Sequence, residues 1–235
     1  MNILILTTNT THHTYFTKEL ISKFKNIFVI CEKKKIKFKY KTYHLFEKKR
    51  DKFEIKKWFK NKNHQLTKSK NIIFVKDLNS LNLKNILKNK LDLILVFGTS
   101  VLSRKFLQNI NCPILNFHGG NPEKFRGLDS HLWAILDHKI NELKVTIHKL
   151  KPEIDRGDIL YLKKIKLKKN MKIYEIRKQT TEICLNLAIK TINAIANKKK
   201  LLFKKQKKIG KYYSAMNTHL KGKCEKIFNR YTSSL

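Results

Sequence analysis

Short apolar segments of strand length alternate with helical segments along the first half of the chain, and this alternation limits the folds open to it. The segment 91–98, LDLILVFG, is apolar on both faces, as a central strand of a parallel sheet would be. The same criteria predict further strands at 2–8, 26–31, 71–76 and 114–118, and helices at 11–24, 51–60, 78–90 and 103–110. Strands that alternate with helices indicate an open, mostly parallel, Rossmann-like α/β sheet wound by right-handed crossovers.

The second half begins with the same kinds of segment and then changes character. The pattern predicts helices at 130–138 and 172–196, and strands at 143–150 and 159–167. Residues 197–235 carry 12 Lys or Arg side chains and one acid, Glu225. We therefore expect an α/β catalytic domain over residues 1–196, followed by a short helical, basic C-terminal appendage at 197–235 with some structure around 210–216.

The chain of 235 residues has a formal net charge of +36, which on its face suggests a polyanionic partner. Only six of the 53 basic residues are arginine, the side chain best suited to bidentate phosphate recognition. The lysines are spread along the chain, which favours a compositional bias and a generally solvated surface. Nucleic-acid binding stays open, with most weight on the basic appendage.

No apolar run reaches the roughly 18 residues that a membrane span needs, so we expect no membrane insertion. The start of the chain has no basic segment before its short apolar run, which predicts a cytoplasmic protein rather than a secreted one. The four cysteines are scattered, with no CxxC, and are interpreted as free thiols. His131, His138 and His148 stand at mixed spacings and are interpreted as helix-face or strand residues, so no metal is expected.

The segment ILNFHGGNPEKFRG, residues 114–127, places Asn116 and His118 two apart at the end of a predicted strand, hence on one face. Ligands of open α/β sheets bind beyond the carboxyl ends of the strands. An amide, an imidazole and a later carboxylate, Asp155, suit oxyanion binding and proton transfer. No activated Ser or Cys accompanies them, which points to direct acyl transfer. The structural alternatives stay open at this point: an N-x-H pair with no catalytic role, and an Asp155 that caps a turn.

Three ordered motifs resemble one family. NFHGGNPEKFRGLDSHLWAI (116–135), VTIH (145–148) and DRGDIL (155–160) are similar to the folate-dependent formyltransferases, a family that includes methionyl-tRNA, glycinamide ribonucleotide and sugar N-formyltransferases. VFGTSVLS (96–103) resembles the strand and loop beside the folate in that family. The resemblance covers roughly residues 1–170 and implies the family's α/β sheet. Lys144 departs from the family's usual glycine, and HGGNP departs from its commoner loop after the histidine.

The resemblance implies roles for particular residues. Asn116 would bind the formyl oxygen, His118 would be the catalytic histidine, and Asp155 would assist proton transfer. The formyl donor would be N10-formyltetrahydrofolate, used as a co-substrate without a metal. Its pocket would be lined by residues of the 97–100 and 151–157 segments: Phe97, Gly98, Thr99, Ser100, Ile154 and Gly157.

The acceptor is the less determined substrate. The resemblance to sugar N-formyltransferases favours a nucleotide-linked amino sugar for surface polysaccharide, contacted by His12, His13, Gly119, Gly120 and Arg126. A methionyl-tRNA acceptor is less favoured because few strand-like runs follow residue 196, and glycinamide ribonucleotide because TTNTTHHTYF (7–16) has no glycine. An inactive binding module of the same fold and a basic nucleic-acid-binding protein remain the non-enzyme alternatives. The sequence leaves a homodimer open.

Overall fold

The computed structural model describes residues 1–34, 36–83, 90–108 and 110–235. The strands are β1 (Ile3–Thr8), β2 (Ile27–Glu32), β3 (Ile72–Val75), β4 (Leu93–Phe97), β5 (Ile114–His118), β6 (Phe125–Gly127), β7 (Lys144–Lys149), β8 (Ile159–Lys164) and β9 (Lys211–Tyr213). The helices are α1 (Thr11–Lys23), α2 (Leu45–Phe59), α4 (Arg104–Leu107), α5 (Ser130–Leu136), α6 (Ile176–Ala196) and α7 (Thr218–Ser233). Three 3-10 turns are η1 (Leu78–Ser80), η2 (Ile140–Glu142) and η3 (Ile173–Glu175).

Seven strands form one open sheet in the order β3-β2-β1-β4-β5-β7-β8. The first five pair in parallel, while β7 pairs antiparallel with both β5 and β8. The strong apolar segment lies at the centre, as predicted, because β4 pairs with β1 on one side and β5 on the other. The strand order reverses between β1 and β4, which is where open α/β sheets bind their ligands. The predicted mostly parallel, open α/β sheet is confirmed.

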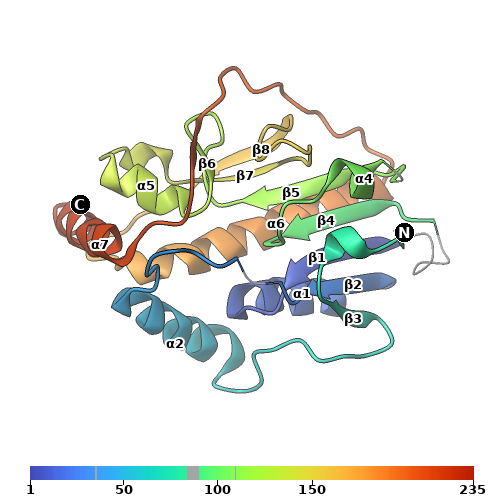
Figure 1. Ribbon diagram of the computed structural model, residues 1–235, viewed down its shortest axis with the longest axis horizontal. Coiled ribbons are helices and arrows are strands. Elements are labelled where there is room, and N and C mark those ends of the chain that lie inside the picture. The colour runs from blue at the N-terminus through green and yellow to red at the C-terminus, as the bar shows by residue number, and fades with distance from the viewer. Residues whose placement is uncertain (35, 84–89, 109) are drawn as a thin grey trace.

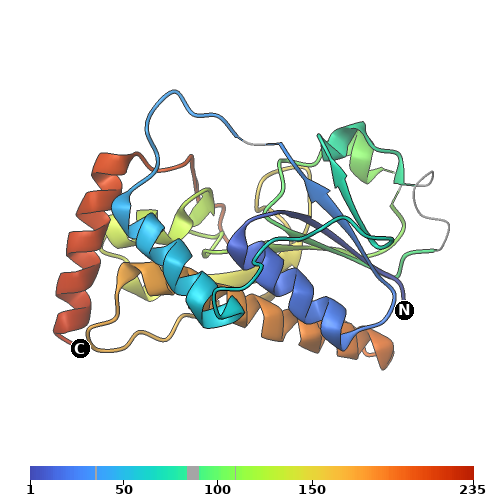
Figure 2. The same ribbon diagram turned by 90° about the horizontal axis from the view of Figure 1, so that it is seen from below.

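Each face of the sheet is covered by a separate apolar cluster, since the central strands bury side chains on both sides. α1 and α6 pack together over one face, and Phe16, Leu20 and Leu187 belong to its core. Figure 2 shows α1, α2 and α6 on this same side of the sheet. The other face is covered by η1 and α4 through Leu78 and Phe106. Of the predicted helix 78–90, the described part begins with η1, and residues 84–89 lie outside the described residues.

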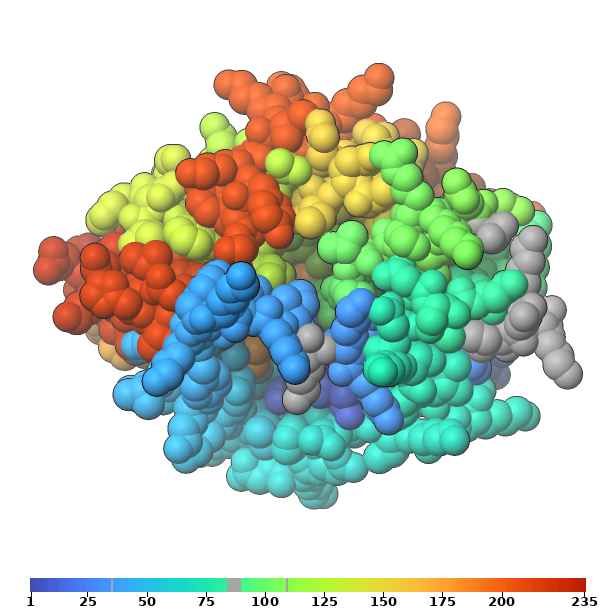
Figure 3. All heavy atoms as spheres, viewed as in Figure 1, coloured from blue at the N-terminus to red at the C-terminus, as the bar shows by residue number. Residues whose placement is uncertain are grey.

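The residues after α6 cross the molecule (Figure 1), and their strand β9 forms a separate two-stranded sheet with β6. Residues 204–213, here called the strap, begin at a bridge between Lys204 and Ile159 and end in β9, which pairs in parallel with β6. Figure 3 shows this orange-red segment against the green and yellow segments that carry β5 to β8. The sequence predicted a short helical, basic appendage with some structure around 210–216, without bounds for a helix. The structure has β9 and then the 16-residue helix α7, which packs on α5.

Buried ion pairs join α2 to α6 and α7. The Arg177 guanidinium donates to Glu54, whose side chain is fully buried, with Nε 2.8 Å from Oε1, and also to Asp51 at 2.7 Å. The Lys221 ammonium lies 3.1 Å from both carboxylate oxygens of Glu47. These contacts give the buried charges of three helices explicit partners, as burial of charge requires.

None of the helices within the described ranges combines the length and hydropathy needed to cross a membrane. All four cysteines are free thiols, as the sequence predicted.

Candidate functional site

Asn116, His118 and Asp155 meet at the carboxyl end of β5. Nδ1 of His118 lies 3.4 Å from Oδ2 of Asp155, and Nδ2 of Asn116 lies 3.4 Å from Oδ1 of the same carboxylate. His118 and Asp155 are both buried, with 7% and 8% of their surface exposed. Asp155 has a left-handed backbone, with φ at 53°, in the loop between β7 and β8. The structure therefore brings together the three side chains that the sequence singled out.

His148 is a fourth member of this cluster, and the sequence argument did not place it there. Its Nε2 lies 3.1 Å from Nδ2 of Asn116 and 3.4 Å from Oδ1 of Asp155. Its Nδ1 donates to the Lys149 carbonyl oxygen at 2.8 Å, which leaves Nε2 as an acceptor for the Asn116 amide in the neutral ring. The antiparallel pairing of β5 with β7 brings His148 into the cluster, because its register sets His148 directly opposite Asn116.

The Asp155 carboxylate is held in its charged form. Burial opposes its ionisation, but the imidazoles of His118 and His148 and the backbone N–H of Gly127 outweigh that effect and hold its pKa well below the usual range. The Gly127 N–H donates to Oδ2 at 2.8 Å. A buried negative charge therefore lies between the two imidazoles.

His118 faces oxygen acceptors through both ring nitrogens. Nε2 lies 3.1 Å from the carbonyl oxygen of Phe125, and Nδ1 faces Asp155. Close packing around Gly120 sets the ring position, because a Cβ there would lie 2.7 Å from His118 Nε2 and 2.6 Å from the Ser130 Cβ. The arrangement offers a partner for a proton on either nitrogen, which a proton relay requires.

The 97–100 segment lies at the end of β4, beside the reversal of strand order. Ser100 is fixed there, because its N–H and its hydroxyl each donate to the buried carboxylate of Glu32 at 2.7 Å. Thr99 donates its hydroxyl to the Ser100 carbonyl oxygen at 2.9 Å, and the Phe97 ring is buried. Gly98 has a φ of +78°, and a Cβ there would fall on the ring of His13. The close approach that the glycine allows is thus an approach to His13.

His12 and His13 open α1 at the end of β1. The Nδ1 atom of His13 lies 2.7 Å from the Thr8 hydroxyl and 2.8 Å from the Thr10 hydroxyl, and the His13 ring packs edge-on against Phe97. Burial, and then the nearby Arg177 guanidinium, lower the pKa of His13 to about 3. Burial, and then His13, lower the pKa of His12 well below its ordinary value. Both rings are therefore neutral near pH 7.

The depressed pKa of His13 predicts a loss of stability in acid. Between its ordinary value of 6.5 and about 3, the unfolded chain binds a proton at His13 that the folded chain does not, so stability falls as the pH falls through this window. Between pH 7 and pH 5, the free energy of unfolding should fall by about 2 kcal/mol less in His13→Gln than in the unmodified chain. Urea denaturation at both pH values measures the difference, and parallel losses would contradict it.

The remaining predicted residues surround the cluster of Asn116, His118, His148 and Asp155. The Arg126 guanidinium donates to the Ile154 carbonyl oxygen at 3.1 Å and to the Gly210 carbonyl oxygen at 2.6 Å. Gly119 lies beside the ring of His131, and Gly157 lies against the Lys149 backbone, which a Cβ would displace. Arg126 thus ties the Asp155 loop to the strap through backbone carbonyls.

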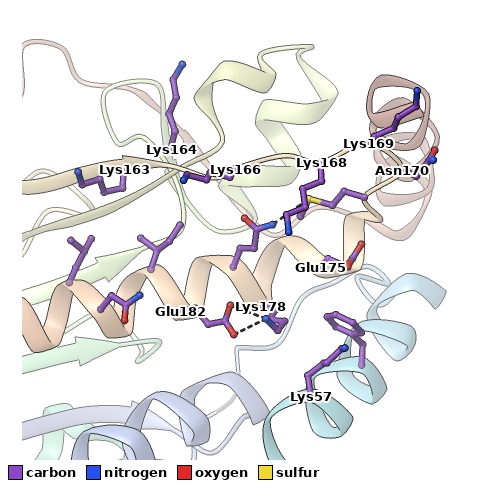
Figure 4. A pocket seen from close by; sticks show the side chains of 16 residues that line it. Lys57, Lys163, Lys164, Lys166, Lys168, Lys169, Asn170, Glu175, Lys178 and Glu182 are labelled. Carbon is purple, nitrogen blue, oxygen red and sulfur yellow. Dashed lines mark hydrogen bonds and ion pairs between the residues drawn. The ribbon is translucent and has the colours of Figure 1, made fainter. Parts of the chain in front are cut away.

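A separate groove of about 960 Å³ lies between α2, α6 and the end of β8. Figure 4 shows that its lysine side chains come from the strand, from the loop after it, from α2 and from α6, with Lys164 and Lys169 extending away from α6. The lysines that line it are Lys57, Lys163, Lys164, Lys166, Lys168, Lys169 and Lys178. Its acids are engaged, since Glu182 pairs with Lys178 at 2.7 Å and Glu175 accepts from the Lys172 N–H. Asn116, His118, His148 and Asp155 do not line this groove.

No group of three or more His, Cys, Asp or Glu side chains among the described residues is arranged to hold a metal ion.

A family model described as formyl transferase matches residues 1–192. No curated protein sequence matches the chain.

Three solved structures illustrate the likeness in fold. An N-formyltransferase from Helicobacter canadensis, in complex with folinic acid and dTDP-3-aminofucose, is 17% identical with a TM-score of 0.59 over 99% of this chain and 80% of that one. A 4-N formyltransferase from Francisella tularensis is 18% identical, with a TM-score of 0.59 over 91% and 76% of the two chains. A methionyl-tRNA formyltransferase from Clostridium thermocellum is 14% identical, with a TM-score of 0.53 over 92% and 73%. At these identities the likeness establishes the fold alone.

Proposed function

The chain belongs to the formyl transferase family, and on that premise we propose that it transfers a formyl group from N10-formyltetrahydrofolate to the amine of a nucleotide-linked amino sugar. The observation that carries the proposal is the buried cluster of Asn116, His118 and Asp155 at the end of β5. The cluster fits a formyl donor, since it offers N–H donors for a carbonyl oxygen and a proton acceptor for an amine.

In the proposed reaction a C–N bond forms between the acceptor amine and the formyl carbon, the bond from that carbon to the donor nitrogen breaks, and one proton passes from amine to leaving nitrogen. The Asn116 amide lies 3.4 Å from Asp155 Oδ1 and 3.1 Å from His148 Nε2. It binds the formyl oxygen with the N–H that makes the longer of these contacts, the one to Asp155. Such a donor contributes about 2.7–4 kcal/mol. His118 relays the proton, and the Asp155 charge stabilises the imidazolium.

The amino-sugar acceptor rests on two kinds of support. The Helicobacter canadensis relative in fold was solved with dTDP-3-aminofucose and folinic acid. In this chain, the neutral His12 and His13 lie at the reversal of strand order beside β4, where an open α/β sheet receives its ligand. Methionyl-tRNA and glycinamide ribonucleotide are the alternative acceptors.

A spectrophotometric assay of tetrahydrofolate release tests the proposal. The protein is mixed with N10-formyltetrahydrofolate and, separately, with nucleotide-linked amino sugars, glycinamide ribonucleotide and charged initiator tRNA. Turnover with an amino sugar alone is the expected result. Turnover with tRNA alone would mean that the acceptor is methionyl-tRNA and not an amino sugar. Failure to bind the folate donor would overturn the proposed formyl transfer itself.

Adding a methyl group beside His118 is expected to slow the reaction. In Gly120→Ala the new Cβ would lie 2.7 Å from His118 Nε2, so the ring has to move. A displacement of about 1 Å costs about 10²-fold in kcat. Gly119→Ala is the matched comparison and should cost much less, since the atom nearest to its Cβ would be His131 Cε1, at 3.3 Å. Equal kcat values for the two variants would contradict this account of the ring position.

Nucleic-acid binding is a second candidate function, and the lysine groove is the observation that favours it. Seven of the 16 residues lining the groove are lysine, and no ion pair among the described residues engages the five at 163–169. Phosphate backbones bind such surfaces by releasing counterions, which makes the affinity depend on salt.

Variants of two sets of three lysines distinguish nucleic-acid binding in the groove from binding that depends only on the overall charge. Lys166, Lys168 and Lys169 line the groove, whereas Lys48, Lys49 and Lys52 are exposed on α2 outside it. Fluorescence anisotropy of labelled single-stranded RNA is measured against salt after replacing each triplet with glutamine. A salt slope reduced by about 2 for the groove triplet alone supports the function, and equal effects of both triplets would assign the binding to net charge.

A further inference from the structure

The loop that carries Asp155 is held from the strap by one side chain, Gln206. Nε2 of Gln206 donates to the carbonyl oxygen of Asp155 at 2.7 Å and to that of Gly157 at 2.8 Å. Arg126 holds the preceding carbonyl, that of Ile154, at 3.1 Å. Backbone carbonyls of a loop have no ladder partners of their own, so these side chains supply them.

The contact constrains a residue in an uncommon conformation. Asp155 has a φ of 53°, in the left-handed region that non-glycine residues seldom occupy without support. Because Gln206 binds the carbonyls on both sides of Arg156, it closes the turn that aims the Asp155 side chain at His118. The strap itself is fixed at both ends, by the Lys204 bridge to Ile159 and by the pairing of β9 with β6.

The contact with the two loop carbonyls is unfavourable for the other end of the Gln206 amide, its Oε1 atom. This Oε1 atom is buried and has no hydrogen-bond partner among the residues that the structure describes. An unsatisfied buried acceptor is unfavourable, and each such group calls for an explanation. The two carbonyls fix which way the amide points, because only the NH₂ end can donate to them.

We propose that Gln206 is a positioning residue for the catalytic carboxylate: it acts through Asp155, by holding the loop that presents the carboxylate to His118. The inference rests on the proposed formyl transfer and extends its machinery into the segment after α6. Four groups face the carboxylate: Asn116 and His118 from β5, His148 from β7 and the Gly127 N–H from β6. Loosening the loop weakens all of these contacts together.

Two near-isosteric variants test the proposal. Gln206→Met removes the donor and is expected to lower kcat by about 10²-fold, as a displacement of about 1 Å would. Gln206→Glu turns a carboxylate toward two carbonyl oxygens and should be as slow near pH 7. Its activity relative to the unmodified chain should rise as the pH falls, because the protonated acid again donates one hydrogen bond. Lys205→Met, an exposed neighbour on the strap, is the matched control and should keep the full kcat.

A second readout does not depend on turnover. The Asp155 carboxyl is followed by ¹³C NMR against pH, with its signal assigned from Asp155→Asn, and its pKa should rise toward the ordinary value in Gln206→Met but not in Lys205→Met. If both the kcat and the Asp155 titration of Gln206→Met match those of the unmodified chain, the positioning role is wrong. If the unmodified chain formylates nothing, the proposed function fails, while the titration still decides the role of Gln206.

Discussion

Replacing His118 with glutamine is expected to lower kcat for formyl transfer by about 10²–10⁴-fold, the range that general acid–base groups contribute. Glutamine is close to histidine in size and still forms hydrogen bonds, but it cannot take up the amine proton. The Asp155 carboxylate would keep its Gly127 N–H and His148 contacts, so the site should remain folded. Steady-state rates at saturating donor and acceptor measure the loss.

His219→Gln provides the control for this change, because His219 is exposed on α7, away from the cluster. The control should retain the full rate. A His118→Gln variant with the same kcat as the control would remove His118 from the proton path and leave Asn116 as the main catalytic group.

Removing the Arg177 guanidinium is expected to destabilise the fold by about 3–5 kcal/mol, since the Glu54 carboxylate would remain buried without its partner. Arg177→Met keeps much of the side-chain length. Chemical denaturation near pH 7 measures the change in the free energy of unfolding. The double change Glu54→Met with Arg177→Met should recover much of the loss, because no unpaired charge is then buried.

The exposed pair of Arg104 and Glu153 is the comparison. Its nitrogen and oxygen atoms are 2.8 Å apart, but both side chains are largely solvated. Arg104→Met should therefore change the free energy of unfolding very little. If Arg177→Met were no more destabilising than Arg104→Met, the buried pair would not be what joins α2 to α6.

The strands were predictable from the sequence wherever a segment is apolar on both faces. β4 and β1 bury every side chain from Leu93 to Phe97 and from Ile3 to Thr7, and a continuous apolar run is all that such a strand requires. The appendage was expected to be helical, but the bounds of α7 were not predicted. Cys224, Phe228 and Thr232 recur at intervals of four, and lysines and Gly222 dilute that stripe. β6 and β9 have three residues each, too few for a periodic signal.

The candidate site was predictable in part. Asn116 and His118 stand out because they share one face of a strand end. Asp155 was named with them as a later carboxylate, and it also matches the family motif. His148 belongs to the same cluster through an antiparallel register that local patterns do not reveal. Gln206 had no signal, since its role depends on where the strap crosses the loop, more than 40 residues away along the chain.

The most direct measurement of the central claim follows the formyl carbon itself. N10-formyltetrahydrofolate labelled with ¹³C in its formyl group is incubated with the protein and a nucleotide-linked amino sugar, and the products are analysed by mass spectrometry and ¹³C NMR. The account predicts that the label appears as a formamide on the sugar amine, and that His118→Gln prevents this. Label found only in free formate, or left on the folate with every amino sugar offered, would contradict transfer to a sugar.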